Sequence, residues 1–281
     1  MTNSNGLQTN RDAWVYNSSH AKVEKSISIL VKKYNKLLKQ TGDKDEFIDS
    51  QDQVIKWSSS LVSKFNSGLK LEFDADNIRH GIYRPFFKQF IYRDDDLNHR
   101  PYQLPKIFPT ANQSNLLICV AGVGVTKGFS AIITDTLPDL ELIGKSQCYP
   151  LYYYEEQDKQ SPTLFDYANQ NESDYIRRDG VSDFILGRAK KQYGKNVTKE
   201  DIFYYVYGIL HSPDYRSAFA NDLKKMLPRL PLVEDVRDFW KFSKAGRQLA
   251  ELHINYEEVA AYPGVLVHFN RVPKKEIEKG L

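Results

Sequence analysis

The hydrophobic periodicity of the chain changes twice, and these changes limit the folds open to it. Apolar residues recur every three or four positions in 17–40, which predicts an amphipathic helix, and the same spacing over 54–65 predicts a second helix with Gly68 as its C-cap. In the middle of the chain the apolar residues are β-branched or aromatic and stand in short runs. Helical spacing returns after about residue 180.

Five runs in the middle of the chain predict strands: LKLEF (69–73), YRPFFKQFIYRD (83–94), NLLICVAG (115–122), SAIITD (130–135) and YPLYYY (149–154). Turn-forming residues separate them, and the lack of a helix after each strand argues against a doubly wound α/β fold. A polar stretch over 157–180 marks an internal boundary. We predict an α+β fold with N-terminal helices, a mixed or antiparallel β-rich middle and a C-terminal helical part, divided as 1–68, 69–156 and 157–281.

The C-terminal part carries clear helix signals. VSDFILGRAKKQYG (181–194) is amphipathic, and TKED (198–201) has the spelling of a capping box before IFYYVYGIL. His211 falls at the junction between two helices. A short apolar run, GVLVHF (264–269), predicts a strand near the C-terminus. The first dozen residues are polar and are expected to be frayed.

The stretch YGILHSPDYRSAFANDLKKMLPRLP (207–231) loosely matches the PD…DxK spelling of a nuclease, but its apolar residues step by four, four and three. This spacing predicts one helix over 213–226, with Ser212 as its N-cap. Asp214 and Asp222 would then stand about 12 Å apart along the helix axis and would not share a metal ion. We therefore interpret the stretch as architecture.

Composition excludes several classes of protein. Hydrophobic residues make up 41% and aromatic residues 13%, as in a packed globular protein, and 39 Lys+Arg against 36 Asp+Glu leave a net charge of +3 that permits anionic partners. Cys119 and Cys148 stand in apolar surroundings without a CxxC spacing and are expected to be reduced core thiols. No apolar run approaches the roughly 18 residues of a membrane span, and no signal peptide opens the chain, so we expect a cytoplasmic protein without a membrane partner.

Five blocks, in this order, carry a resemblance to a known family: RDAWVYN (11–17), YRPFFKQFIY (83–92), ITDTLPDLELIGKSQCYPLYYY (133–154), YVYGILHSPDYRSAFANDLKKMLPRLP (205–231) and AGRQLAELHINYE (245–257). Over nearly its whole length the chain resembles the C-terminal target-recognition (specificity) region of Type ISP restriction-modification enzymes. The resemblance implies a module that binds double-stranded DNA and reads an asymmetric target. It also implies that a nuclease, an ATP-driven translocase and an adenine-N6 methyltransferase precede the module in a long polypeptide.

The same resemblance implies that S-adenosylmethionine, ATP and Mg²⁺ are used by the parent enzyme and not by this chain. The chain begins after the methyltransferase and ends at VPKKEIEKGL, where family members continue with further helices. We therefore expect an excised or split piece of a longer enzyme, in contact with the methyltransferase and translocase domains.

Motifs of catalysis are missing from the sequence. Methylation of adenine needs a [DN]PP[YF] tetrapeptide, and none is present. AGVGVTKG (121–128) is glycine-rich but lacks the spacing of an ATP or dinucleotide loop, so it predicts a tight turn, with Lys127 near DNA phosphate. The histidines are scattered and the cysteines unpaired. We expect no catalytic residue, no metal site and no cofactor on this chain.

Three regions hold the candidate DNA-binding residues. Basic and aromatic side chains interleave most densely over 79–106, where the candidates are Arg79, Arg84, Lys88, Arg93 and Arg100. A polar break between strands, GKSQC (144–148), contributes Lys145, Ser146 and Gln147. Basic residues over 175–195 allow phosphate steering, with Arg177 and Arg178 as candidates. The alternative in each region is a solvated strand, a plain turn or a charged helix face.

Two other functions stay open. The first is a coupling module that docks onto the methyltransferase and translocase with little DNA contact. The second is an enzyme with an unrecognised site. Loss of DNA binding on replacing Arg84 and Arg100 would favour recognition over docking, and turnover by the isolated chain would favour an enzyme.

Overall fold

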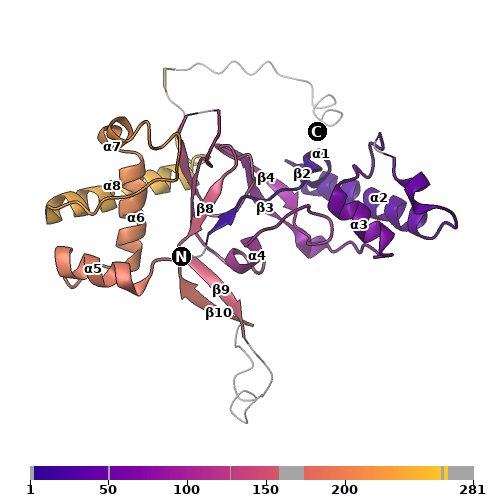
Figure 1. Cartoon of the computed structure of the whole chain (residues 1–281), viewed down its shortest axis with the longest axis horizontal. Helices are drawn as coiled ribbons and strands as arrows, with labels where there is room; N and C mark the ends of the chain where they lie inside the picture. Colours follow the sequence, from indigo (N-terminus) through magenta and orange to yellow (C-terminus); the bar gives the residue numbers. More distant parts are fainter. Residues whose placement is uncertain (1–2, 50, 127, 158–173, 261–262, 265–281) are drawn as a thin grey trace, which may run out of the picture.

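The computed structural model describes residues 3–49, 51–126, 128–157, 174–260 and 263–264, and the statements below concern these residues. A central β-rich body separates two groups of helices (Figure 1). One group contains α1 (Asp12–Val15), α2 (His20–Leu38) and α3 (Ser59–Asn66), and the other contains α5 (Asp183–Tyr193), α6 (Lys199–Leu210), α7 (Pro213–Ala218) and α8 (Val236–Ile254). The predicted α+β class is confirmed. Among the described helices, none has the length and apolar character needed to cross a bilayer.

Both predicted N-terminal helices are present, but the second is shorter than predicted. α2 buries residues three or four positions apart, including Val23, Ile27 and Leu30. α3 begins only at Ser59, because the backbone N–H groups of 54 and 55 bond to the Asp52 carboxylate at 2.7 and 3.0 Å instead of starting a helix. Gly68 follows the helix with φ +81°, as expected of a C-terminal cap.

Four antiparallel strands form the central sheet, in the order β1 (Ser4–Asn5), β8 (Gln147–Pro150), β5 (Leu117–Val120), β6 (Ala131–Thr134). The strands predicted over 115–122 and 130–135 are confirmed. From residue 3 onward the N-terminal segment is not frayed as predicted, because Ser4 and Asn5 form the edge strand of this sheet and pair with β8. Short polar strands of this kind carry almost no hydrophobic pattern, so periodicity could not reveal the pairing.

Both faces of this sheet are covered. Along β5, Leu117 and Cys119 belong to a core shared with the N-terminal helices, whereas Ile118 and Val120 belong to a core shared with the C-terminal helices. Side chains alternate between the two faces of a strand, so two covered faces require apolar residues at every position. This explains the continuous apolar run in the sequence. It also places the central sheet between the two hydrophobic cores.

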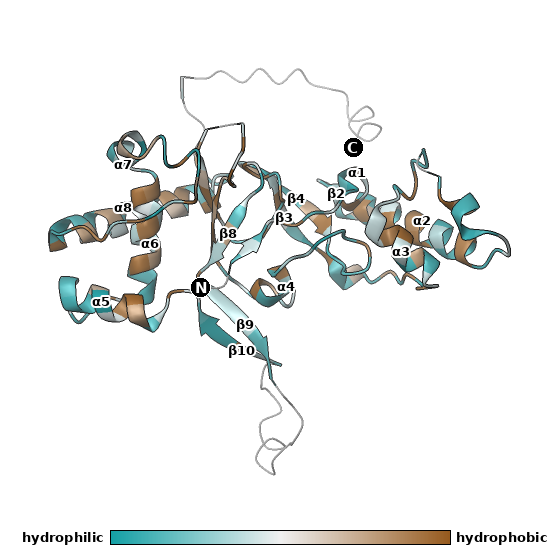
Figure 2. Cartoon of the chain, in the orientation of Figure 1, coloured by the Kyte–Doolittle hydropathy of each residue, from teal (hydrophilic) through white to brown (hydrophobic). Residues whose placement is uncertain are grey.

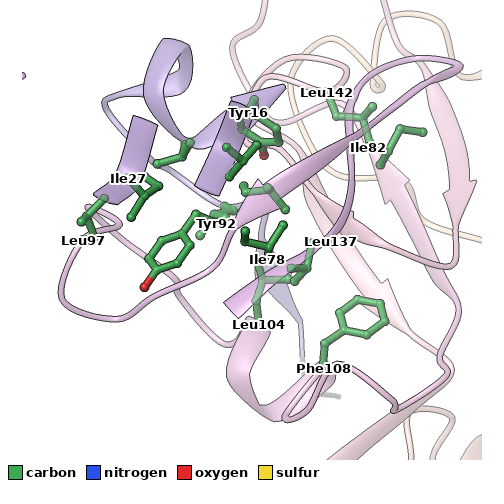
Figure 3. Close-up of a cluster of buried hydrophobic side chains, with 14 of the residues drawn as sticks. Tyr16, Ile27, Ile78, Ile82, Tyr92, Leu97, Leu104, Phe108, Leu137 and Leu142 are labelled. Atoms are coloured by element: carbon green, nitrogen blue, oxygen red, sulfur yellow. The ribbon is translucent and has the colours of Figure 1, made fainter. Parts of the chain in front are cut away.

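A second sheet has the order β2 (Tyr16–Asn17), β4 (Phe87–Tyr92), β3 (Ile78–Arg84), β7 (Leu137–Pro138), in which the β3–β7 pair alone is parallel among the described strands. The single strand predicted over 83–94 is wrong, because it contains the turn of a β3–β4 hairpin. Pro85 has no N–H for a ladder, and Phe86 adopts φ +56° in the turn. Ile78, Ile82 and Tyr92 of this hairpin pack in the core with Ile27 (Figure 3).

The strand predicted over 69–73 is also absent from the structure, where the segment is extended without a strand partner. Side chains of α2 take the place of a neighbouring strand. The Asn35 side chain bonds to both the N–H and the C=O of Leu71, at 3.1 and 2.7 Å, and the Tyr34 hydroxyl donates to the carbonyl of Leu69 at 3.1 Å. Backbone polar groups near the core need partners, but those partners need not form a sheet.

The strand predicted over 149–154 is divided between two sheets. Residues up to Pro150 belong to β8, whereas Tyr152–Glu156 form β9, which pairs with β10 (Tyr175–Asp179) as a separate antiparallel ribbon. The chain bends after Pro150, where the Leu151 N–H bonds to the carbonyl of Leu116 at 2.8 Å. The polar stretch predicted as a boundary over 157–180 therefore contains β10, and its residues 158–173 lie outside the described ones.

The C-terminal helices begin largely where the sequence predicts. Thr198 and Asp201 form the predicted capping box of α6, and the Ser212 hydroxyl accepts from the N–H of Tyr215 at 3.3 Å at the start of α7. α7 ends at Ala218, much earlier than predicted, and successive turns follow it. The strand predicted over 264–269 lies almost entirely outside the described residues. Short helices η1 (Lys44–Phe47), η2 (Ala75–Asn77) and α4 (Leu104–Ile107) complete the described elements.

The junction of α6 and α7 holds His211, as predicted, and partly buries its ring. The His211 ring lies 4.7 Å from the Tyr207 ring and 5.6 Å from the His253 ring, centroid to centroid. Its Nε2 atom is buried and makes no hydrogen bond to any described residue. Burial, followed by the charges of Arg216 and His253, lowers the pKa of His211 from its ordinary 6.5 to about 4.

Replacing His211 with Asn is expected to make stability less dependent on pH. Between pH 6.5 and about 4 the unfolded chain binds more protons than the folded one, so the free energy of unfolding falls as the pH drops through this window. As the pH is lowered, the free energy of unfolding of the variant should fall by about 2 kcal/mol less than that of the unmodified protein, allowing for the partial exposure of the ring. Urea unfolding at pH 7 and pH 4.5 measures it, with the exposed His20→Asn as control. Equal pH slopes for the two variants would contradict the assignment.

Candidate nucleic-acid interface

The ribbon formed by β9 and β10 projects from the central body (Figure 1) and is hydrophilic along most of its length (Figure 2). Its register places Arg177 opposite Tyr154 and Arg178 opposite Tyr153, so the two arginines lie on opposite faces. The Arg177 guanidinium stacks 4.4 Å from the centroid of the Tyr152 ring. Both arginines are exposed, and the ribbon therefore presents a guanidinium to solvent on each face.

Buried contacts fix the base of the ribbon. The Asn115 side chain donates to the carbonyls of Tyr152 and Ile107 at 2.7 and 3.0 Å, and it accepts from the N–H of Tyr152 at 3.1 Å. At the end of β10, a Cβ on Gly180 would stand 2.0 Å from the carbonyl oxygen of Pro150, so no larger residue fits there without a shift. The ribbon thus leaves the body in a defined direction.

A cleft of about 700 Å³ lies between the half of the ribbon that is farther from its base (154–156 and 175) and the open end of the β3–β4 hairpin. Arg79 and Arg93 line it. Arg79 donates to the carbonyl of Phe108 at 3.1 Å, and burial, followed by the neighbouring charge of Arg93, lowers the pKa of Arg79. Arg93 is buried and pairs with Asp95 at 2.7 Å. Further carboxylates line the cleft, at positions 94, 96, 155 and 156. Such mixed donors and acceptors suit base edges better than a row of phosphates.

Arg84 and Lys88 lie toward the opposite end of the same hairpin, about 17 Å and about 10 Å along the strand from Arg79 at the rise of a β-strand. Arg84 pairs with Asp139 at 2.8 Å and stacks 3.9 Å from the centroid of its neighbour's ring at position 83. Lys88 donates to the carbonyl of Ile254 at 2.9 Å and stands 3.4 Å from Asp135. These two side chains connect the hairpin to its neighbours. The structure therefore separates basic residues that are adjacent in the sequence.

A ladder of amide side chains runs along the N-terminal segment, and of its members the sequence analysis identified Gln147 alone. Gln8 and Arg100 exchange backbone hydrogen bonds at 3.1 and 2.9 Å, which brings two distant segments together. The Gln8 side chain accepts from the Tyr102 hydroxyl at 3.2 Å and donates to Asn10 at 3.1 Å. The Gln147 side chain donates to Asn5 one step along. We call these residues, Asn5, Gln8, Asn10, Tyr102 and Gln147, the amide ladder.

Two candidates beside the ladder differ in their availability. Arg100 is exposed, and its side chain forms no ion pair with a described carboxylate. Ser146 is fully buried and accepts from the N–H of Ile143 at 3.2 Å, so it supports the turn instead of facing solvent. Exposed Lys145 stands in this turn with φ +45°, packed against the loop at Gly122. Lys127, the remaining candidate of that loop, lies outside the described residues.

Metal ligands do not gather on the described part of the chain, where no group of three or more His, Cys, Asp or Glu side chains could hold an ion. The two cysteines are buried free thiols of the central sheet, as predicted. Their sulfur atoms lie 3.2 Å apart, and burial raises the pKa of the Cys148 thiol well above its usual range.

A comparison with protein-family models gives a match over residues 1–280 to the Type ISP C-terminal specificity domain. The chain belongs to this family. The resemblance seen in the sequence blocks is therefore confirmed, and the helical ends and β-rich middle are those of a restriction-modification specificity domain. No curated protein matches the chain significantly.

Solved structures place the fold of this specificity domain inside larger enzymes. The DrdV–DNA complex matches 98% of this chain at 30% identity with a TM-score of 0.82. The ATP-dependent Type ISP restriction-modification enzyme LlaBIII bound to DNA matches 93% at 32% identity with a TM-score of 0.78. A nuclease-deletion mutant of the Type ISP enzyme LlaGI, in complex with a DNA substrate mimic, matches 94% at 32% identity with a TM-score of 0.75. The chain spans 26%, 16% and 19% of these three proteins.

Proposed function

We propose that this specificity domain binds duplex DNA and selects the target sequence of a Type ISP-like restriction-modification enzyme. The observation that carries the proposal is the match to relatives at 30–32% identity, which share the fold over at least 93% of the chain and whose structures contain DNA. Relatives at this identity share the path of the backbone. We therefore look for the DNA-facing surface on elements of this shared fold.

The β9–β10 ribbon is the element best shaped to read bases. The major groove of B-DNA is about 12 Å wide and admits a two-stranded β-ribbon. Arg177 and Arg178 point to opposite faces of the ribbon, so a ribbon inside the groove would direct one guanidinium to each side. Arginine is the side chain that most often reads guanine, through two parallel hydrogen bonds.

The amide ladder, with Arg100 and Lys145, supplies a second set of contacts. Asn and Gln side chains pair with adenine edges, and exposed Arg and Lys side chains neutralise phosphates. The ladder leads into the ribbon through α4, which follows Tyr102 and Gln103 and packs against β9. Helix α4, which lies beside β9, therefore links the two sets (Figure 1). Arg84, Lys88 and Ser146 are engaged within the protein, and we assign them supporting roles.

Catalysis would reside elsewhere in the parent enzyme. An adenine-N6 methyltransferase using S-adenosylmethionine and a nuclease coupled to an ATP- and Mg²⁺-dependent translocase would act on the DNA that this domain selects. The domain itself is proposed to contribute binding and selection without turnover, because the sequence carries none of the tetrapeptides that hold a flipped adenine.

Selection from randomised duplex DNA tests the proposal directly. The purified chain is mixed with labelled random duplexes at two salt concentrations, and the bound fraction is sequenced. We expect enrichment of one asymmetric site together with salt-sensitive affinity. Salt-sensitive binding without enrichment would contradict sequence selection by this chain. Absence of binding at low salt would contradict the proposal as a whole.

A further inference from the structure

An apolar groove of about 530 Å³ lies on the face of the central sheet that is turned toward the C-terminal helices. Its floor contains Ile118, Val120 and Tyr149 of the sheet, and its walls are α5, α6 and the extended strap over 228–232. Among the residues that line it, Arg188 is the single charged side chain.

Hydrogen bonds hold the groove open in one shape. The Tyr205 hydroxyl donates to the carbonyl of Pro231 at 2.7 Å, and the Tyr193 hydroxyl donates to the carbonyl of Val233 at 2.6 Å. These two bonds fasten the strap to α6 and α5. The groove is therefore preformed, and an occupant would not need to unfold the strap in order to enter.

Apolar side chains at the groove remain partly open to solvent. Val206 of α6, Ile185 of α5 and Leu230 of the strap are half-buried, and Phe184 next to the groove is 71% exposed. A contiguous apolar surface of this kind usually marks an interaction site. The surface lies on the face of the central sheet that the C-terminal helices cover, and none of the residues that line it belongs to the ribbon or the amide ladder.

The basic side chains around the groove determine which kind of segment it can bind. Helix α5 and the strap carry Arg188, Lys190, Lys191 and Arg229, and none of these forms an ion pair with a described carboxylate. The acidic residue at the start of α5, Asp183, is already paired with Lys199 at 2.6 Å. A segment that combines apolar and acidic side chains would therefore complement the groove, and a basic one would be repelled.

The path of the N-terminal segment identifies the source of that occupant. Ser4 and Asn5 pair with β8, and the Asn3 side chain lies beside Tyr149, a residue of the groove floor. The family is a C-terminal domain, so the rest of such an enzyme connects through this end of the chain. A segment attached there would meet the groove at a high effective concentration.

We propose that the groove docks an acidic, apolar segment of the parent enzyme that directly precedes this domain. The contact would fix the domain against the catalytic part of the enzyme. We expect it to be independent of DNA reading, because no residue that lines the groove belongs to the amide ladder or is one of the two ribbon arginines.

Two matched synthetic peptides test the chemistry of the groove. Both have 16 residues with leucine at the same positions, and one carries glutamate where the other carries lysine. Fluorescence anisotropy of each labelled peptide is measured with the full chain. We expect the Leu/Glu peptide to bind at least about ten-fold more tightly than the Leu/Lys peptide. Equal affinities, or preference for the lysine peptide, would overturn the proposal.

Three variants locate the binding. Val206→Glu, in the groove, should weaken the Leu/Glu peptide by about ten-fold or more, whereas Leu252→Glu, at a more exposed apolar position on α8, should not. Arg188→Glu should reverse the charge preference. DNA affinity, measured on the same samples, should not change, which separates failure of this proposal from failure of the proposed function. Peptide binding that ignores Val206 and Arg188 would overturn the assignment.

A fusion tests the proposed source of the segment. The Leu/Glu peptide is joined through a short Gly-Ser linker to the N-terminus of the chain. Because attachment raises its effective concentration, the fused peptide should exclude the free labelled peptide and lower its apparent affinity at least ten-fold, and Val206→Glu should abolish this competition. Free peptide that binds the fusion and the unmodified chain equally well would overturn the N-terminal route.

Discussion

Replacing Gly246 with Ala is expected to destabilise the domain by about 3 kcal/mol, because two helices cross there in backbone contact. A Cβ on Gly246 of α8 would stand 1.9 Å from the carbonyl oxygen of Tyr204 on α6, and a Cβ on Gly208 of α6 would stand 2.3 Å from the carbonyl oxygen of Phe242. Backbone atoms cannot rotate away as a side chain can. The helices would have to separate, which would loosen the core that covers one face of the central sheet.

Thermal unfolding measures this effect, and the chain offers a matched control. We expect the melting temperature of Gly246→Ala to fall by about 8 °C. Gly187 lies inside α5, where an added Cβ would meet no atom within 4 Å, so Gly187→Ala should be neutral or raise stability by up to about 1 kcal/mol through helix propensity. Equal melting temperatures for the two variants would contradict the close crossing.

The sequence predicted correctly those elements whose apolar spacing has one structural explanation. α2 and the start of α6 follow from spacing and capping residues, and these signals are local. The segment over 69–73 alternates apolar and charged residues like a half-buried strand, yet it is not a strand, because the side chain of Asn35, from a helix distant in sequence, satisfies the backbone of Leu71. Burial alone makes such a segment apolar. Composition therefore cannot distinguish a strand from an extended segment held by side chains.

Two prolines in the sequence mark places where a predicted strand is divided. Pro85 and Pro150 each stand inside a run predicted as one strand, and each marks the place where the strand ends. Proline removes a ladder hydrogen bond, so a proline within a predicted strand predicts a division. The division at Pro150 creates the β9–β10 ribbon. The most prominent feature of the candidate interface thus depends on one residue that lacks an N–H.

The candidate interface was predictable in residue type but not in arrangement. Arg177 and Arg178 were identified from charge, but their presentation on a projecting ribbon depends on pairing with β9, which periodicity does not specify. Of the amide ladder, the sequence identified Gln147 alone, because the ladder forms through backbone pairing of the N-terminal segment with two distant segments. Long-range pairing of short polar strands is the information that a single sequence lacks.

Replacing Arg178 with Ala is expected to weaken binding to the selected DNA site by about 10- to 100-fold, the loss that follows from one bidentate contact between arginine and a base. Arg177 would contact the DNA from the other face of the ribbon, so we expect a similar loss of affinity for Arg177→Ala. The double variant should lose discrimination between the selected site and random duplex. The alternative is that the two guanidinium groups contact phosphates. In that case affinity would fall equally for every sequence, and the dependence of log Kd on log salt concentration would decrease by about one unit per arginine.

Arg237 provides a closely matched control for this measurement. Like Arg178, it is an exposed arginine paired with one acidic neighbour, Asp235 at 2.7 Å against Glu155 at 2.9 Å for Arg178, but it lies at the start of α8 and not on the ribbon. Arg237→Ala should therefore keep the full affinity and specificity. Titration of each variant with the selected duplex and with a scrambled duplex separates base reading from phosphate contact. If Arg178→Ala and Arg237→Ala bind the selected duplex equally well, the ribbon does not read the DNA, and the amide ladder becomes the surface to test.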